Sequence, residues 1–256
     1  MIVYYNGRFL PKEDVRISPD DRGFLFGDGV YEVVCAYDGQ FFELEAHLDR
    51  LARSLREVRM AGPERSVLKE MAYELLQRTE VETPHAKLYV QVTRGAAPRR
   101  HAFPEDGTPP TVYAEIGPYE LPEAEWERGV RAIVEPDRRW ARCDIKSVAL
   151  LPNVMASQRA KEEGAFEAIL QRKGLVTEGS HSTVAGVFDG TVVTHPLTHH
   201  ILPSVTRAVA LELCTELGIP VEEVPFAAAR LQDAEELMEL PSIGGKGFHV
   251  APLPLG

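Results

Sequence analysis

The first third of the chain alternates apolar and polar residues with the period of β-strands and then with that of α-helices. Runs rich in β-branched and aromatic residues flank Asn6-Gly7 and Asp38-Gly39, and two-residue turns of this kind are typical of β-hairpins. Between residues 44 and 60 the apolar residues recur every three or four positions, which predicts an amphipathic helix. Its apolar face consists of Leu44, Leu48, Leu51, Leu55 and Val58. A second helix is predicted after Pro63.

The next segment indicates that the chain divides into two domains. Strands are predicted at 86–95 and 111–117, joined by a polar loop, and the residues that follow are rich in proline and glycine. This composition is common in linkers between domains. We therefore expect an α+β protein with a small domain at 1–117, a linker at 118–123 and a larger domain at 124–256.

The second half of the chain again mixes strands and helices. A strand is predicted at 130–135, a pair of strands at 166–179, and a hairpin at 183–195 that turns at Asp189-Gly190. Helices are predicted at 154–164 and 204–218, each ended by a glycine.

Composition and charge exclude several classes of function. The chain has 256 residues, a formal net charge of -11 and three widely spaced cysteines without a C-x-x-C pair. The negative charge argues against nucleic-acid binding, because phosphate contacts need clustered Lys and Arg. No apolar run reaches the roughly 18 residues of a membrane span, and the N-terminal residues do not resemble a signal peptide. We expect a cytoplasmic protein with no membrane or nucleic-acid partner.

Lys146 stands in unusual surroundings. It precedes the apolar run 148–151 in the segment CDIKSVALLPN. Burying an ammonium without a partner costs on the order of several kcal/mol, so such a lysine often titrates low or becomes covalently modified. A lysine at a strand end can also extend its charge to water. The local sequence leaves both interpretations open.

Two other polar groups are candidates for binding an anion. Ser204, Val205 and Thr206 stand at the predicted start of a helix, where free N–H groups and the helix dipole favour negative charge. Ser204 would also serve as an ordinary N-cap. Arg99 and His101, two residues apart in the polar loop, have the donors to clamp a carboxylate, although loop charges are often solvated.

The remaining polar candidates carry little information singly. His195, His199 and His200 lie in a Pro-containing loop with no carboxylate at helical spacing, so no metal site is predicted. The chain has no G-x-S-x-G elbow, no P-loop and no G-x-G-x-x-G after a strand. Taken alone, Arg50 and Glu178 fit solvated positions.

The order and spacing of six motifs are more specific than any single residue. The motifs are FGDGVYE, HLDRL, VTRGAAPRRH, DIKSVALLPNVMA, FEAILQRKGLVTEGS and THP followed by ILPSVTR. Together they resemble the class IV aminotransferases, the fold-type-IV enzymes of pyridoxal 5′-phosphate (PLP), over residues 1–226. The loop with Arg99 and His101 is most similar to that of the D-amino-acid transaminases. The resemblance implies the two-domain fold-type-IV architecture, PLP as cofactor, and amino transfer between D-amino acids, such as D-alanine or D-glutamate, and 2-oxo acids.

The resemblance also implies roles in binding the cofactor. Lys146 matches the lysine that forms the Schiff base with PLP and acts as the catalytic base, which accounts for its apolar surroundings. Glu178 matches the carboxylate that pairs with the pyridine nitrogen of PLP. The expected cofactor contacts, mainly to the phosphate, also include Arg50, Val205, Thr206 and Ser242.

Substrate binding and assembly are implied in the same way. Tyr31 matches a tyrosine near the substrate carboxylate. Arg99 and His101 match a carboxylate-binding pair that reaches across from the neighbouring subunit of a homodimer. Ser180 and His181 are further expected substrate contacts.

Departures from the family pattern leave other activities open. Thr183 and Ala185 stand where the family usually has Asn and Phe, and after Ser242 the Thr/Ser-rich turn of the family is not recognisable. Within the fold, a branched-chain L-amino-acid transaminase, an R-selective amine transaminase and aminodeoxychorismate lyase are alternatives. A non-catalytic phosphate-binding protein is another, but it would need neither Lys146 nor Glu178.

Overall fold

The chain forms two compact units, each with helices and sheets. The computed structural model describes residues 1–79, 83–241 and 248–250. The first unit comprises Met1–Glu120 together with Ile145–Ala149, and the second comprises Leu121–Asp144 and Leu150–Gly256. The α+β class predicted from the sequence is confirmed.

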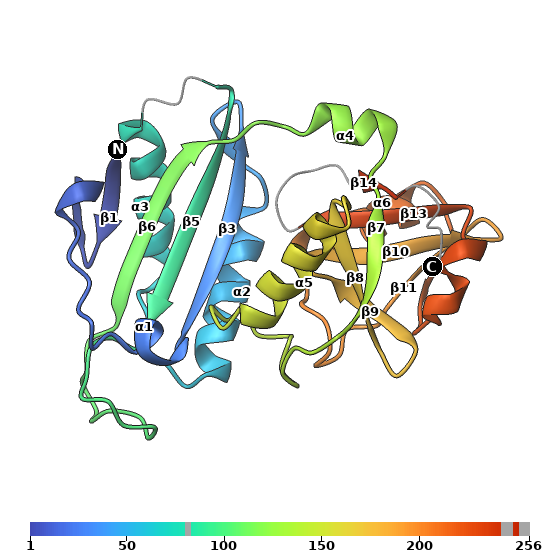
Figure 1. Ribbon diagram of the computed structural model, residues 1–256. Helices are drawn as coiled ribbons and strands as arrows, with labels where there is room; N and C mark the ends of the chain where they lie inside the picture. The colour runs from blue at the N-terminus through green and yellow to red at the C-terminus, as the bar shows by residue number, and fades with distance from the viewer. Residues whose placement is uncertain (80–82, 242–247, 251–256) are drawn as a thin grey trace. The chain divides into compact units, whose positions relative to one another are not determined.

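An antiparallel sheet forms the frame of the first unit (Figure 1). In the part of the chain that the structure describes, this sheet has six strands in the order β2-β1-β6-β5-β3-β4. The strands are β1 (Ile2–Tyr5), β2 (Arg8–Pro11), β3 (Gly29–Tyr37), β4 (Gln40–Phe41), β5 (His85–Thr93) and β6 (Thr111–Pro118). The predicted hairpins are β1–β2 and β3–β4. Asn6-Gly7 and Asp38-Gly39 all have the positive φ that such tight turns require.

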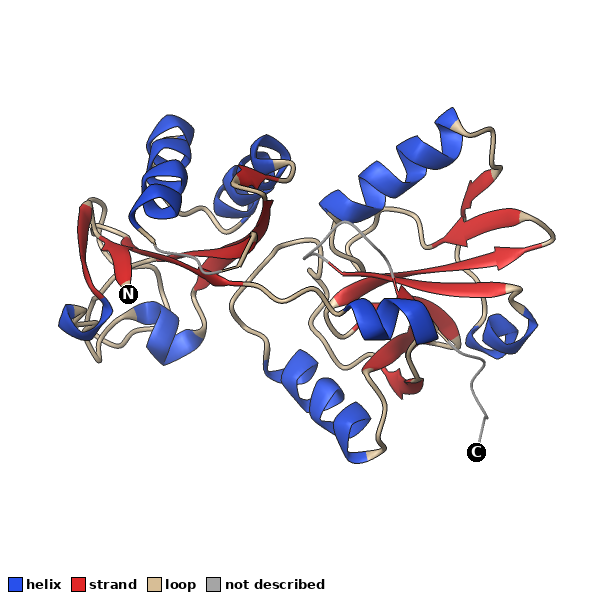
Figure 2. Cartoon of the chain, turned by 90° about the horizontal axis from the view of Figure 1, so that it is seen from above, coloured by secondary structure: helices blue, strands red, loops and turns tan. Residues whose placement is uncertain are grey.

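Two long helices cover one face of this sheet (Figures 1 and 2). The helices of the unit are α1 (Arg22–Phe26), α2 (Leu44–Glu57) and α3 (Arg65–Arg78), with a 3₁₀ turn η1 (Lys12–Asp14). The predicted apolar face of α2 is buried in one hydrophobic core with residues of the sheet, and burying one such leucine stabilises the fold by about 1.5–3 kcal/mol. The buried residues include Leu44, Leu48, Leu51 and Leu55 of α2 with Leu88, Val90, Ala114 and Ile116 of the sheet.

The segment Ile145–Ala149 returns to the first unit by pairing with the start of β3. The Val148 N–H donates to the Gly29 carbonyl at 3.0 Å, and the Tyr31 N–H donates to the Lys146 carbonyl at 3.0 Å. The sequence predicts Lys146 within the second domain. The structure instead groups Lys146 with the first unit, because the backbone bonds to β3 hold its segment there. The sequence could not predict this grouping, since these bonds join residues far apart in the chain.

The second unit contains two sheets. Among its described residues, one sheet has three strands in the order β7-β8-β9, and the other has five in the order β12-β11-β10-β13-β14. The strands are β7 (Ala132–Pro136), β8 (Glu167–Arg172), β9 (Leu175–Gly179), β10 (Ser182–Phe188), β11 (Thr191–Thr194), β12 (Val221–Glu223), β13 (Glu236–Pro241) and β14 (Phe248–His249). The predicted hairpin is β10–β11, turned at Asp189-Gly190.

The helices of the second unit are α4 (Glu123–Arg128), α5 (Leu151–Glu162) and α6 (Val205–Glu216), with a 3₁₀ segment η2 (Ala228–Asp233). Helices α5 and α6 are the two predicted from the sequence. Helix α4 begins at the end of the expected linker, and the sequence did not predict it. Within the described ranges, no helix combines the length and the apolar character that a membrane crossing requires.

Candidate active site

Lys146 is buried in the first unit. Only 7% of its surface is exposed, so it does not extend its charge to bulk water from a strand end. Its Nζ lies 4.5 Å from the centroid of the Tyr31 ring, a position in which a cation is attracted by the face of the ring. The Lys146 N–H donates to Ser54 Oγ at 3.3 Å, which ties this segment to α2. The structure therefore brings together two residues that the sequence assigned to the site, Lys146 and Tyr31.

A buried ionic cluster connects β3 with α2. Arg50 donates through Nε to Glu32 Oε1 at 2.7 Å and through Nη2 to Glu32 Oε2 at 2.8 Å. His47 Nδ1 lies 2.9 Å from Glu32 Oε2. Strand alternation places Glu32 on the same face as Val30, which packs in the core beneath α2, and helical spacing places His47 beside Arg50. The sequence predicted Arg50 but neither of its partners.

The charge of this cluster is set by burial and by Arg50. Burial alone would raise the pKa of Glu32, but the charge and hydrogen bonds of Arg50 outweigh it and lower the pKa to about 2. The nearby charge of Lys146 acts in the same direction. Burial lowers the pKa of His47, so its ring is neutral at pH 7. The Arg50 guanidinium is therefore a buried cation whose orientation is fixed by Glu32.

Arg99 and His101 lie in an exposed loop between β5 and β6, which extends beyond the end of the sheet (Figure 1). The Arg99 guanidinium lies 5.3 Å from the centre of the Phe26 ring, and the His101 ring lies 5.6 Å from it. The Arg22 guanidinium donates to the carbonyls of Arg100 at 2.7 Å and of Ala102 at 3.3 Å. Helix α1, which the sequence did not predict, thus fixes the shape of the loop.

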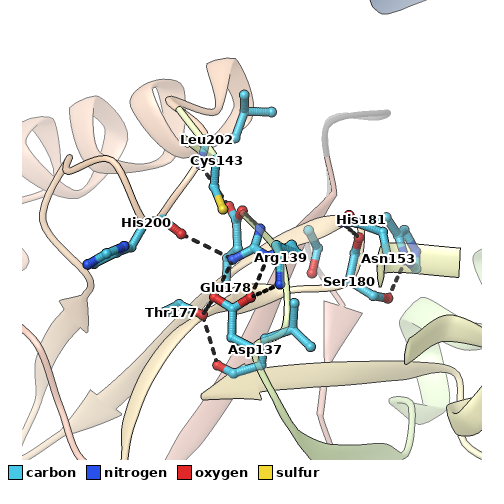
Figure 3. Close-up of polar contacts among 12 residues, drawn as sticks. Asp137, Arg139, Cys143, Asn153, Thr177, Glu178, Ser180, His181, His200 and Leu202 are labelled. Carbon is cyan, nitrogen blue, oxygen red and sulfur yellow. Dashed lines mark hydrogen bonds and ion pairs between the residues drawn. The ribbon is translucent and has the colours of Figure 1, made fainter. Parts of the chain in front are cut away.

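Glu178, at the end of β9 in the second unit, is a buried and ion-paired carboxylate (Figure 3). Arg139 Nη1 donates to Glu178 Oε1, and the Leu202 N–H donates to Glu178 Oε2 at 2.9 Å. The Arg139 guanidinium is held in place because it also donates two bonds of 2.9 Å to Asp137 and one of 3.1 Å to the His200 carbonyl. Burial raises the pKa of Glu178, and the charge of Arg139 limits that rise. The solvated position that the sequence also allowed for Glu178 is therefore wrong.

The turn after Glu178 is anchored by hydrogen bonds inside the second unit. Ser180 is buried, its carbonyl accepts a bond from Asn153 Nδ2 at 2.7 Å (Figure 3), and its Oγ donates to Glu167 Oε1 at 3.2 Å. The His181 N–H donates to the same Glu167 oxygen at 2.6 Å, while its ring is about half exposed. The two residues expected to contact the substrate therefore depend on Glu167, which the sequence did not single out.

The start of α6 has the form of an anion site. Ser204 is the N-cap, because its Oγ accepts the Arg207 N–H at 3.2 Å. Val205 and Thr206 form the first turn and are buried. The first N–H groups of a helix have no acceptor within the helix. Ser242 lies outside the described residues.

The three histidines considered for metal binding have other contacts. His199 Nδ1 lies 3.1 Å from Asp144, His200 Nδ1 lies 3.1 Å from Arg172, and His195 Nδ1 lies 2.8 Å from the next backbone carbonyl. Within the described residues, no group of three or more His, Cys, Asp or Glu side chains is arranged to hold a metal ion.

Comparison with known proteins identifies the family. The family model described as Amino-transferase class IV matches residues 29–245. A D-alanine aminotransferase of Staphylococcus epidermidis is 41% identical over 238 residues, covering 92% of this chain and 83% of that protein. A D-alanine aminotransferase of Bacillus licheniformis is 43% identical over 242 residues, covering 93% and 83%. The chain therefore belongs to the class IV aminotransferases, which are PLP-dependent.

Solved structures have the same fold. The branched-chain amino acid aminotransferase of Escherichia coli superposes with a TM-score of 0.88 at 22% identity, covering 97% of this chain and 85% of that chain. The fold-type-IV transaminase CpuTA1 of Curtobacterium pusillum gives a TM-score of 0.84 at 23% identity, covering 97% and 88%.

The groups present fit PLP by their chemistry. PLP carries an aldehyde, a phosphate and a pyridine nitrogen, and each calls for a different kind of partner. The first unit offers the buried amine of Lys146 and the guanidinium of Arg50. The second unit offers the buried carboxylate of Glu178 and the Val205-Thr206 helix start. Amine, cation, carboxylate and helix N-terminus are the partners that such a molecule needs.

Proposed function

We propose that this protein transfers amino groups between D-amino acids, such as D-alanine and D-glutamate, and 2-oxo acids. The observation that carries the proposal is the similarity to the two D-alanine aminotransferases, which extends over more than 90% of this chain. Arg99 and His101 support it, because they supply donors for a substrate carboxylate in a loop whose backbone is fixed by Arg22.

Lys146 is proposed as the catalytic residue. Bound PLP would supply an electron sink that lets the Cα–H bond of an amino acid ionise. Lys146 Nζ would hold the cofactor covalently between turnovers and, once released, would take the proton from the substrate Cα. Its burial beside Tyr31 supports this role, because these surroundings shield the amine from bulk water and hold it in a defined position.

Glu178 is proposed to pair with the pyridine nitrogen. A carboxylate there keeps the nitrogen protonated, provided that the carboxyl group is itself ionised. Arg139 supports the ionised form against the effect of burial. Arg139 is therefore proposed as a positioning residue for Glu178.

The phosphate is proposed to be held by Arg50 in the first unit and by Val205 and Thr206 in the second, with Ser242 as a further contact. The buried guanidinium supplies a charge that Glu32 orients, and the start of α6 supplies N–H donors and a hydroxyl.

Selectivity for D-amino acids is proposed to follow from where the carboxylate binds. Once the substrate nitrogen and the Cα–H bond are placed, only the carboxylate and the side chain remain to be accommodated. The group that takes the carboxylate therefore decides the hand of the substrate. Arg99, His101 and Tyr31 are proposed for this role, with Ser180 and His181 as neighbouring substrate contacts.

We also propose a homodimer, in the cytoplasm, in which the loop with Arg99 and His101 serves the partner's site. Two features support assembly: this loop is exposed, and α5 presents Leu151, Val154 and Met155 with exposures of 69%, 60% and 62%. Apolar residues at this density on one short helix are typical of interaction surfaces.

A mixing experiment tests the crossing of the loop. Lys146→Ala and Arg99→Ala variants are each expected to be inactive or severely impaired. If the loop crosses, a mixed dimer restores one complete site, so dissociating and reassociating the two variants together should recover activity. A mixture no more active than its components would show that each loop serves its own subunit.

The activity itself is tested by pyruvate formation from D-alanine and 2-oxoglutarate. L-leucine, an R-amine and the substrate of aminodeoxychorismate lyase are assayed in parallel. We expect D-alanine to react fastest. Faster transamination of L-leucine than of any D-amino acid would move the chain to the branched-chain enzymes.

A further inference from the structure

The second unit contains a pair of buried carboxyl groups that the proposed chemistry does not use. Glu167 on β8 and Glu239 on β13 are both 0% exposed. Glu239 is the ladder partner of Val184 on β10, and the N–H of Ser182, two residues earlier on the same strand, donates to Glu167 Oε1. The charge of Glu167 also raises the pKa of Glu239, which indicates that the two carboxyl groups are neighbours. Because an ionised carboxylate only accepts hydrogen bonds, a bond between two carboxyl groups requires a proton on one of them.

The distribution of donors shows which group needs the proton. Glu167 Oε1 accepts the N–H groups of His181 at 2.6 Å and Ser182 at 3.1 Å, and the hydroxyl of Ser180 at 3.2 Å. Over the described residues, neither Glu167 Oε2 nor either oxygen of Glu239 has a donor. A buried charge without hydrogen bonds is very unfavourable. A proton on Glu239, donated to Glu167 Oε2, removes the second charge and supplies the missing donor.

We propose that Glu167 and Glu239 share one proton, and that the resulting pair of carboxylate and carboxylic acid positions the turn Gly179–Ser182. The turn comes directly after Glu178 and carries Ser180 and His181. The functional part of this inference rests on the proposed roles of those residues; the shared proton does not.

The turn packs directly against the pair. A Cβ atom built at Gly179 would lie 2.4 Å from both Glu167 Oε1 and Ser182 Oγ, closer than any real contact. The turn therefore has no room to move toward Glu167. Its three hydrogen bonds to one carboxylate oxygen also prevent it from moving away without losing them. The position of the turn depends on Glu167 accepting these bonds and on Glu239 staying neutral.

Among the described residues, the strands beside the pair place few titratable groups opposite it. The register partners of Glu239 in the adjacent strands are Val184 and Phe248, and that of Glu167 in β7 is Ala132. None of these titrates. His181 is the exception, because its Nδ1 lies 3.1 Å from Glu167 Oε1.

The pair makes stability depend on pH in a definite direction. Burial, and then the charge of Glu167, raise the pKa of Glu239 well above its ordinary value of 4.5. As the pH rises above that value, the unfolded chain loses this proton while the folded chain keeps it. The stabilisation is therefore complete at acid pH and is lost as the pH rises through the folded pKa. Ionised Glu239 would also place a second anion behind the turn.

The first test is the melting temperature as a function of pH for wild type and Glu239→Gln. The amide cannot ionise, yet its NH₂ group can donate to Glu167. We expect the variant to match wild type at about pH 5 and to become progressively more stable than wild type toward about pH 9. Glu236→Gln, at an exposed position on the same strand, is the matched control and should give a flat difference. If the difference in melting temperature between Glu239→Gln and wild type also stays constant with pH, the proposal of a shared proton is overturned.

An infrared spectrum supplies a second readout that does not depend on folding stability. Wild-type protein at neutral pH should show the C=O band of one protonated carboxyl group, and this band should be lost in Glu239→Gln but kept in Glu236→Gln. The same band strength in all three proteins would contradict the assignment.

The positioning role is tested kinetically with Glu239→Leu, which has no donor for Glu167, against Glu239→Gln, which has one. Losing a hydrogen bond to a carboxylate corresponds to about a tenfold effect or more, so we expect a rise of that size in the KM for D-alanine in the Leu variant and little change in the Gln variant. Wild type should also lose kcat/KM at alkaline pH more steeply than Glu239→Gln.

The outcomes separate the two proposals. Equal kinetics in wild type, Glu239→Gln and Glu239→Leu, with the expected melting curves, would overturn the positioning role and leave the pair a role in stability alone. If D-alanine is not a substrate, the melting curves and the infrared band still decide whether the proton is shared. If the Leu variant does not fold, the pH profile of the Gln variant carries the kinetic test.

Discussion

Replacing Arg139 by Gln should lower kcat/KM more at acid pH than at alkaline pH. Glu178 is buried and has two contacts of known geometry, with Arg139 and with the Leu202 N–H. The variant would leave a buried carboxylate with one neutral donor. Removing one partner of a buried ion pair costs about 3–5 kcal/mol when the other charge stays in place.

Glu178 can avoid much of that cost by taking up a proton. Burial already raises its pKa, and Arg139 is the main influence in the opposite direction. Without Arg139 the pKa of Glu178 should rise further, so at neutral pH a larger fraction is protonated and cannot pair with a pyridinium. Loss of a preorganised charge contact typically costs on the order of 100-fold in rate, and we expect a loss of this size at neutral pH that shrinks as the pH is raised.

The assay is the pH profile of kcat/KM for D-alanine, together with the absorption spectrum of the bound cofactor. The matched control is Arg138→Gln, which removes the same charge from an exposed neighbouring position. The control should keep the wild-type profile. An Arg139→Gln profile reduced equally at every pH, or one with an unshifted acid limb, would refute the reasoning.

Three further predictions concern Glu178, Arg99 and Glu32. Glu178→Gln should keep the cofactor but slow proton abstraction by on the order of 100-fold, measured by single-turnover kinetics, and an unchanged rate would contradict its assignment. Arg99→Ala should weaken productive binding of D-alanine by about 2–5 kcal/mol in kcat/KM and erode the preference for D over L, whereas Arg100→Ala should not. The low pKa of Glu32, about 2, means that its ion pair with Arg50 stabilises the fold above the ordinary carboxyl range and loses that contribution as the pH falls toward 2. Glu32→Gln should therefore remove part of the acid destabilisation seen in melting curves and weaken PLP binding, and a variant with the wild-type acid profile would argue against the cluster.

Local patterns in the sequence predict much of the fold. Asn6-Gly7, Asp38-Gly39 and Asp189-Gly190 mark hairpins because their backbone conformation is set by the turn itself. The apolar period of α2 predicts which of its residues are buried, because helical geometry fixes the spacing. Short elements such as α1 and β12 escape this kind of prediction. They hold too few residues to show a period, and tertiary contacts hold them in place.

The candidate site is predictable only in part. Lys146, Arg50 and Glu178 stand out through motif order, but their partners do not. Arg139 meets Glu178 across 39 positions of sequence, and the Glu32 bond to Arg50 joins a strand to a helix. Such pairs follow from how elements pack. An isolated Glu in a strand carries no sign of the cation that will neutralise it.

The same limit applies to Glu239. In the sequence Glu239 stands between Met238 and Leu240, and nothing nearby marks it as one of the few glutamates that are fully buried. The structure shows it fully buried in β13, as Glu167 is in β8. Only the fold brings the two carboxyl groups together, and only the shared proton that we propose explains why they are tolerated.

The central claim, that Lys146 binds PLP covalently, has a direct test. Purified protein reconstituted with PLP is reduced with borohydride, digested and mapped by mass spectrometry, with Lys146→Ala treated in parallel. We expect the cofactor mass on the peptide that contains Lys146 and no stable label in the variant. A label on Lys161 or Lys173, or no label on wild-type protein, would contradict the account.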